Sequence, residues 1–259
     1  MSDTSAWSIE QARELYGVTR WGLKYFNVNE QGQVTVSPLR EQGPSLPIAE
    51  VAEEAIDKGL HFPLLIRFQD LLRDRVGIIN QAFNNAIAEF GYQGDYRGVY
   101  PIKVNQLREV VEEIVDAGEP YHYGLEAGSK PELYAALAIH EDPESLIICN
   151  GYKDRRFIRT ALMGVMLGKK VFLVVEKVEE IRHILELAKE MGVEPLIGLR
   201  VRLMTRGKGK WEKSTGEHAK FGLTTQQILE ASRLLKEAGM AHCLKLLHFH
   251  VGSQIPDIL

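Results

Sequence analysis

The stretch Val99-Tyr100-Pro101-Ile102-Lys103-Val104-Asn105 decides the interpretation of the fold, because a single lysine ends an otherwise apolar run. The run follows Gly98, and its residue types and length are typical of a buried strand. Pro101 is disfavoured in a central strand but is tolerated at an edge, at a bulge or in a first barrel strand. A lysine at the carboxyl end of such a strand is expected to be desolvated, which favours the uncharged amine that a Schiff base needs. The alternative is a lysine that only extends its head into solvent.

Strand-like and helix-like segments alternate after this stretch. Strands are expected at 121–126, 146–149, 170–176, 195–203 and 244–251, and helices at 107–117, 131–140, 154–167, 178–191 and 224–238. This alternation predicts βαβ units with a parallel sheet, and right-handed crossovers then limit the fold to a doubly wound sheet or a barrel. Because no glycine-rich dinucleotide fingerprint follows the first strand, we predict an α/β fold of the (β/α)8 TIM-barrel type. About six βα units are counted, whereas a complete barrel has eight. An open six-stranded barrel would leave unpaired strand edges, so we expect this chain to be a barrel that is truncated after about six βα units.

The N-terminal part of the chain has a different character. Residues 1–69 combine aromatic side chains with turn-forming residues and a proline-containing stretch, so we assign them to an N-terminal extension. A short helix is expected at 48–58 and a strand at 63–68. Residues 70–259 are assigned to the incomplete barrel, which opens with a longer helix at 70–90.

Composition restricts the class of partner. The chain has 31 Lys and Arg against 35 Asp and Glu, a net charge of −4, and no basic face suited to nucleic acid or to an anionic membrane. Small molecules are therefore the expected partners. The N-terminus has no secretory signal and no apolar run reaches the length of a membrane span, which predicts a cytoplasmic protein. Cys149 and Cys243 lie far apart in apolar surroundings, which predicts buried, reduced thiols.

The second informative stretch is Leu247-His248-Phe249-His250-Val251-Gly252-Ser253-Gln254. Its two histidines lie on one face of a predicted strand whose carboxyl end shares the functional side of a barrel with Lys103. His250 is placed to lie flat on an aromatic ligand, and the Gly252-Ser253 turn offers a backbone N–H and a hydroxyl to a phosphate. The alternative is a pair of core histidines. Two histidines without a third ligand are weak evidence for a metal, so no metal site is assigned.

Three further features are weighed on the same side of the barrel. Glu126 ends a predicted strand before small residues, and an ordinary turn capped by Ser129 explains this segment equally well. Arg200 lies within an apolar strand, where a guanidinium must find an anion or several acceptors. The lysine-rich loop at 207–214 lacks the glycine and the leading strand of a phosphate-binding P-loop, so we interpret it as a solvated loop.

With these residues in view, the chain resembles the biosynthetic arginine decarboxylases, pyridoxal-phosphate enzymes of the alanine-racemase/ornithine-decarboxylase fold. The segments that carry the resemblance are 98–106, 124–133, 149–154, 220–223 and 247–255. The likeness extends from Tyr16 to Leu259 and includes the N-terminal extension.

The resemblance implies a set of site residues. Lys103 is expected to carry pyridoxal phosphate as a Schiff base and to be the catalytic residue. His250 is expected to stack on the pyridine ring and Ser253 to hold the phosphate. Arg200 is expected beside the cofactor, with Glu126 near it.

The resemblance also implies an activity. This is conversion of L-arginine to agmatine and CO2, the entry to polyamine biosynthesis, by a homo-oligomer, with magnesium implied by family resemblance only. Family members are far longer, so we expect residues 1–259 to be an N-terminal fragment that is inactive alone. Because the substrate pocket is expected beyond Leu259, a barrel that binds pyridoxal phosphate and acts on another basic amino acid stays open. So do a non-catalytic regulatory homologue and a subunit that acts only through protein binding.

Overall fold

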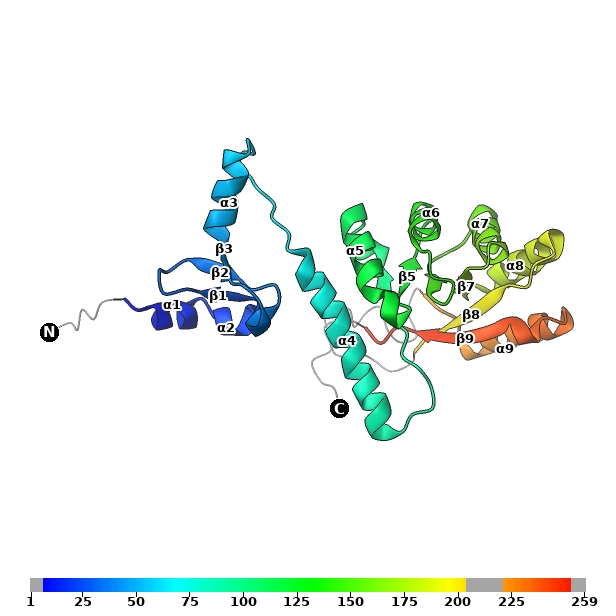
Figure 1. Ribbon diagram of the computed structural model, residues 1–259. Coiled ribbons are helices and arrows are strands. Elements are labelled where there is room, and N and C mark those ends of the chain that lie inside the picture. The colour runs from blue at the N-terminus through cyan, green and yellow to red at the C-terminus, as the bar shows by residue number, and fades with distance from the viewer. Residues whose placement is uncertain (1–6, 204–220, 253–259) are drawn as a thin grey trace. The chain divides into compact units, whose positions relative to one another are not determined.

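The structure is a computed structural model that describes residues 7–203 and 221–252. The chain forms two compact units that divide between Ala82 and Phe83. This boundary falls within the long helix α4 (Gln69–Phe90), which is drawn in cyan and blue-green in Figure 1. No helix among the described residues combines the length and apolar character that a membrane span needs.

The first unit is built on a small antiparallel sheet with strand order β1-β2-β3. Its elements are α1 (Ile9–Leu15), α2 (Val18–Trp21), β1 (Phe26–Val28), β2 (Val34–Val36), β3 (Leu46–Pro47) and α3 (Ile48–Asp57), with a 3-10 turn at Arg40–Gln42. Ser8 begins α1 with a capping box to Gln11. Arg40 fixes the loop before β3, because it donates to the Tyr25 hydroxyl at 2.8 Å and pairs with Asp74 at 2.7 Å.

The predicted strand at 63–68 is wrong, because these residues belong to no strand. The sheet of the first unit ends at β3, and Leu65 is 75% exposed. An apolar run becomes a strand only where a neighbouring strand satisfies its backbone groups. The sequence pattern alone did not contain that information.

The second unit holds a six-stranded parallel sheet in chain order, β4-β5-β6-β7-β8-β9. The strands are β4 (Val99–Pro101), β5 (Gly124–Ala127), β6 (Leu146–Cys149), β7 (Lys170–Val175), β8 (Leu196–Val201) and β9 (Leu244–Phe249). The helices are α5 (Arg108–Gly118), α6 (Lys130–Ile139), α7 (Arg155–Met166), α8 (Val178–Met191) and α9 (Thr225–Glu237). Consecutive order excludes a doubly wound sheet, whose order reverses at a switch point, and confirms the predicted barrel type.

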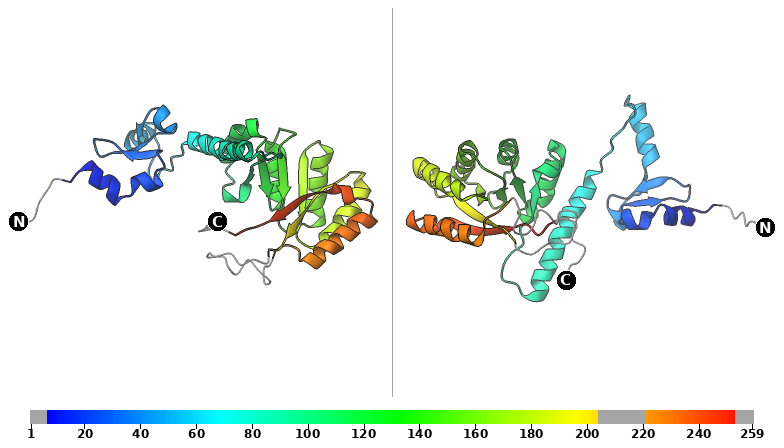
Figure 2. Two further views of the ribbon diagram at one scale, coloured as in Figure 1. Left: turned by 90° about the horizontal axis from the view of Figure 1, so that it is seen from below. Right: turned by 180° about the vertical axis from the view of Figure 1, so that it is seen from behind.

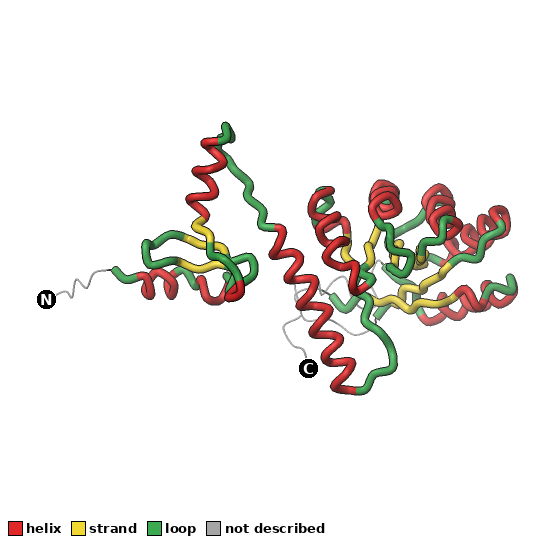
Figure 3. The backbone as a smooth tube through the Cα atoms, viewed as in Figure 1, coloured by secondary structure: helices red, strands yellow, loops and turns green. Residues whose placement is uncertain are grey.

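Helices α5 to α9 cover one face of this curved sheet (Figures 1 and 3). Figure 2 shows the same layering from below and from behind. Alternate strand side chains point to the helices and form one buried cluster, which includes Leu125, Ile147, Leu173, Ile197, Ile158 and Ile181. The opposite face of the sheet is called the inner face below. A Cβ on Gly198 would lie 2.6 Å from the Leu246 side chain and 3.3 Å from that of Val174, which places all three residues on the inner face.

Side-chain caps begin several of these helices directly after the strands. Ser129 accepts a hydrogen bond from the Glu132 N–H and Asp154 accepts one from the Phe157 N–H, so the predicted capping role of Ser129 is confirmed. The caps keep the helix N-termini at the carboxyl edge of the sheet. Both cysteines are buried and free, as predicted.

Replacing Gly124 by alanine tests how tightly the sheet is packed. The new Cβ would lie 2.2 Å from the Leu146 carbonyl oxygen, so β5 and β6 must separate. We expect a loss of about 1–3 kcal/mol in the free energy of unfolding, measured by urea denaturation. Gly128→Ala is the control, because its Cβ meets only the Glu132 carboxylate at 3.6 Å. Equal losses in the two variants would contradict this packing.

Candidate functional site

Polar residues from five strands gather at the carboxyl edge of the sheet. Lys103 follows β4, Glu126 lies in β5, Glu176 follows β7, Arg200 lies in β8 and His248 lies in β9. We call these five residues the inner row. Each comes from a different strand, so parallel pairing brings together residues up to 145 positions apart, from 103 to 248.

Lys103 and Glu126 form the first pair of the inner row. Lys103 Nζ lies 3.4 Å from Glu126 Oε1. The Lys103 side chain is 67% exposed in the part of the chain that the structure describes, so the predicted desolvation of this amine is wrong. The reason is that β4 ends at Pro101, and a 3-10 turn, Ile102–Val104, directs the lysine out of the sheet. The arrangement offers an accessible amine beside a carboxylate.

Arg200 and Glu176 form the second pair. Arg200 NH1 lies 3.0 Å from Glu176 Oε1, and the Glu176 side chain is fully buried. The same oxygen accepts a hydrogen bond from the Gly151 N–H at 2.7 Å. An anion was predicted for Arg200 from the sequence, but Glu176 was not identified as that anion. A glutamate directly after an apolar strand, as at Glu126, was the available signal.

A second buried carboxylate supports Glu176 from α8. Glu180 accepts hydrogen bonds from the backbone N–H groups of Glu176 and Lys153, both at 2.9 Å. The buried Lys153 amine lies 3.3 Å from Glu180 and also donates to the Gly151 carbonyl. Buried charges are tolerated only when they are paired in this way. The turn after β6 is thus tied to the end of β7.

The two histidines of the 247–254 stretch differ in their surroundings. His248 pairs in register with Arg200 and is half-buried. Burial lowers the pKa of His248, and Arg200 lowers it further, while Glu126 and Glu176 oppose the shift. Its Nδ1 is buried without a hydrogen-bond partner among the described residues. His250 follows the strand and is exposed, and Ser253 lies outside the described residues.

Aromatic rings flank the inner row. The Arg200 guanidinium lies over the Phe221 ring at 5.4 Å, and Phe221 contacts Tyr152 at 5.7 Å between ring centroids. The Lys177 amine lies over the Tyr152 ring at 3.7 Å. Each contact is of the cation–π or aromatic type and restricts the side chains that surround Arg200.

The described residues contain no group of three His, Cys, Asp or Glu side chains suited to hold a metal ion. The loop at 207–214 lies outside the described residues. Magnesium therefore has no assigned ligands in this part of the chain.

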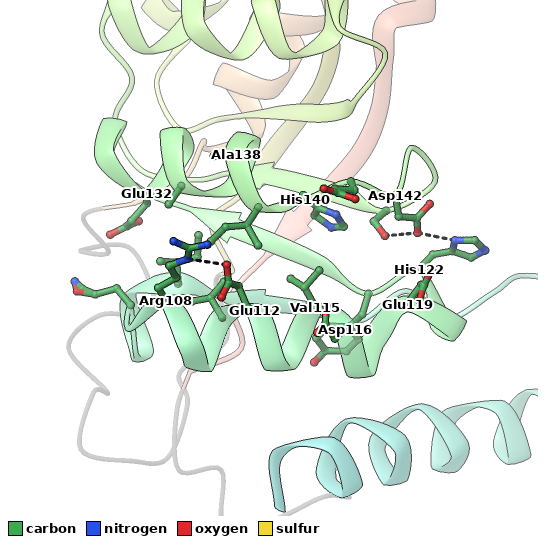
Figure 4. Close-up of a pocket in the computed structure, with 18 of the residues that line it drawn as sticks. Arg108, Glu112, Val115, Asp116, Glu119, His122, Glu132, Ala138, His140 and Asp142 are labelled. Atoms are coloured by element: carbon green, nitrogen blue, oxygen red, sulfur yellow. Dashed lines mark hydrogen bonds and ion pairs between the residues drawn. The ribbon is translucent and has the colours of Figure 1, made fainter. Parts of the chain in front are cut away.

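A groove between α5 and α6 is distinct from the inner row (Figure 4). Four of its charged or titratable side chains pair with one another: Arg108 pairs with Glu112 at 2.7 Å and His122 with Asp142 at 2.8 Å. Burial lowers the pKa of His140, which also lines the groove. We interpret the groove as a gap in helix packing.

Asp142 predicts a pH dependence of stability. Burial alone would raise its pKa, but hydrogen bonds from Ser145, from the Glu144 N–H and from His122 lower the pKa to about 2, from 3.8. This carboxylate therefore stabilises the fold above about pH 4, and the stabilisation is lost as the pH falls through 2, a contribution of about 2 kcal/mol. Asp142→Asn should remove this acid-dependent loss in urea unfolding between pH 5 and 2. The exposed control Glu119→Gln should retain it, and identical pH profiles for all three proteins would contradict the assignment.

Consecutive parallel βα units with polar side chains at the carboxyl edge define a domain of the TIM-barrel type, in which that edge is the functional side. The chain belongs to the pyridoxal-dependent decarboxylases, whose pyridoxal binding domain matches residues 76–259.

Curated relatives and solved structures agree with this family. The chain is 48% identical to a biosynthetic arginine decarboxylase of Prochlorococcus marinus, over 97% of this chain and 39% of the relative. It is 46% identical to that of Bacteroides thetaiotaomicron, over 97% and 40%. The solved biosynthetic arginine decarboxylase of Campylobacter jejuni matches with a TM-score of 0.80 and 37% identity, over 92% of this chain and 38% of that one.

A diaminopimelate decarboxylase from M. jannaschii shares the fold alone. The TM-score is 0.66 at 22% identity, and the match covers 92% of this chain and 50% of that structure. The chain spans about 40% of the length of the curated relatives named above.

Proposed function

We propose that this chain contributes the lysine-bearing part of an arginine decarboxylase, which converts L-arginine to agmatine and CO2 for polyamine biosynthesis. The observation that carries the proposal is the accessible Lys103 amine, 3.4 Å from Glu126 at the carboxyl edge of a parallel sheet. The identity to biosynthetic arginine decarboxylases supports arginine as the substrate.

Residues of the inner row, together with His250, fit pyridoxal phosphate. Lys103 is open to a carbonyl compound, and His250 is exposed beyond β9, where its ring has room to face a ligand. Arg200 has further N–H groups for an anionic group of a ligand. When bound, pyridoxal phosphate supplies the electron sink for loss of the carboxylate.

The protein's own groups bind and orient in this proposal. Glu126 lies close enough to Lys103 to hold a proton at its amine and to fix its direction. Burial and Arg200 lower the pKa of His248, which favours a neutral ring on the inner face. Ser253 is proposed to bind the phosphate.

The domain division, the location, the oligomeric state and the metal belong to the same proposal. Residues 1–69 form an extension and 70–259 the cofactor-binding barrel. The enzyme is a cytoplasmic homo-oligomer without nucleic-acid or membrane partners. Magnesium is proposed from family resemblance alone.

The activity is tested with the protein that carries this chain. Release of labelled CO2 from carboxyl-labelled arginine, and not from ornithine, lysine or diaminopimelate, is the expected result. Release of CO2 from another of these amino acids, and not from arginine, would identify that amino acid as the substrate. No release from any of them would favour a non-catalytic homologue.

Lys103 is predicted to form the covalent link to pyridoxal phosphate. Borohydride reduction followed by peptide mass mapping should place the pyridoxyl adduct on Lys103, because its amine is exposed at the carboxyl edge. Lys130, which pairs with Asp154 at 2.6 Å near the same edge, is the internal control and should stay unmodified. An adduct on Lys130 or Lys220 instead would refute the assignment.

Replacing His250 by alanine should weaken binding of pyridoxal phosphate while leaving the fold intact. An exposed side chain beyond a strand contributes little to the core, whereas loss of a stacking contact costs about 1 kcal/mol of binding. Cofactor titration and thermal unfolding measure the two effects. His61→Ala, at another exposed histidine, is the control. A destabilised variant with unchanged binding would support a core histidine instead.

A further inference from the structure

The carboxylate of Glu176 is fixed from several directions. Its Oε1 accepts hydrogen bonds from Gly151 and Arg200, and its own backbone N–H donates to Glu180 at 2.9 Å. The side chain is fully buried, and Oε2 has no hydrogen-bond partner among the described residues. A carboxylate held in this way is a rigid anchor for whatever it binds.

Arg200 is the side chain that this carboxylate holds. An arginine side chain has many rotamers, and fixing it costs conformational entropy that the ligand must otherwise offset. The bond from NH1 to Glu176 and the Phe221 ring at 5.4 Å restrict the guanidinium before any ligand binds. Because a guanidinium carries five N–H donors, one bond to Glu176 leaves others for a ligand.

We propose that Glu176 is a positioning residue that holds Arg200 at the inner face, ready to bind an anionic group of the ligand. The group is the phosphate of the cofactor or the carboxylate of the substrate. The inference rests on the proposed function and extends it to a residue that touches neither ligand.

A merely structural role makes a different prediction. If Glu176 only ties the turn after β6 to β7 through Gly151, its loss weakens the fold whether or not Arg200 is present. If Glu176 acts through Arg200, its loss changes neither cofactor binding nor KM once Arg200 has been replaced. A double-mutant cycle separates these two cases.

The test compares wild type, Glu176→Gln, Arg200→Met and the double variant in the protein that carries this chain. Pyridoxal phosphate binding is titrated spectroscopically, pyridoxal without phosphate is titrated in parallel, and KM and kcat for arginine are measured. Thermal unfolding of each apoprotein is recorded beside them. Glu180→Gln is the matched control, because it disturbs the same buried network without contacting Arg200.

Arg200→Met should either weaken cofactor binding or raise KM, by about tenfold or more, as expected for the loss of a charge-assisted hydrogen bond. Glu176→Gln should weaken the same constant, and the double variant should be no weaker than Arg200→Met. Glu180→Gln should instead add its effect to that of Arg200→Met. Equal effects on pyridoxal phosphate and pyridoxal with a raised KM would identify the substrate carboxylate, and a loss confined to the phosphorylated form would identify the phosphate.

Additive effects of Glu176→Gln and Arg200→Met, or an Arg200→Met variant without effect, would overturn the inference while the proposed function stands. A wild-type protein that takes up no pyridoxal phosphate would refute both. If Glu176→Gln is not recovered folded, Glu176→Asp replaces it. This variant keeps the carboxylate but shortens the side chain by one methylene, and it should show the same coupling to Arg200.

Discussion

Parallel pairing in chain order brings the carboxyl ends of β4 to β9 to one edge of the sheet, and alternation of side chains then divides each strand between the helices and the inner face. The residues that face the helices are almost all apolar and hold the second unit together. The inner face is free to carry charge at its carboxyl end. The site therefore follows from the same alternation that builds the core.

Charge on the inner face must be compensated, because a buried carboxylate without partners is costly. Glu176 meets this requirement through Arg200 and Gly151. The buried Glu180 of α8 is compensated in the same way by Lys153. These contacts join β7, β8, α8 and the turn after β6. Lys103 and Glu126 are more exposed, which suits groups that must meet a ligand.

Much of this architecture was predictable from local sequence. The apolar run at 146–149 coincides with β6, and the helix predicted at 178–191 coincides with α8, because strand length and helical periodicity are local signals. The three strands of the first unit were not predicted, since each is two or three residues long. Glu180 was not identified from the sequence and is buried, because only the tertiary fold brings Lys153 to it.

The proposed role of the inner row is to receive pyridoxal phosphate at Lys103. A crystal structure of the protein with the cofactor tests it most directly. We expect continuous electron density from Lys103 Nζ to the pyridine ring, with His250 against the ring and Arg200 still bonded to Glu176. Density joined to another lysine, or a cofactor bound between α5 and α6, would contradict it.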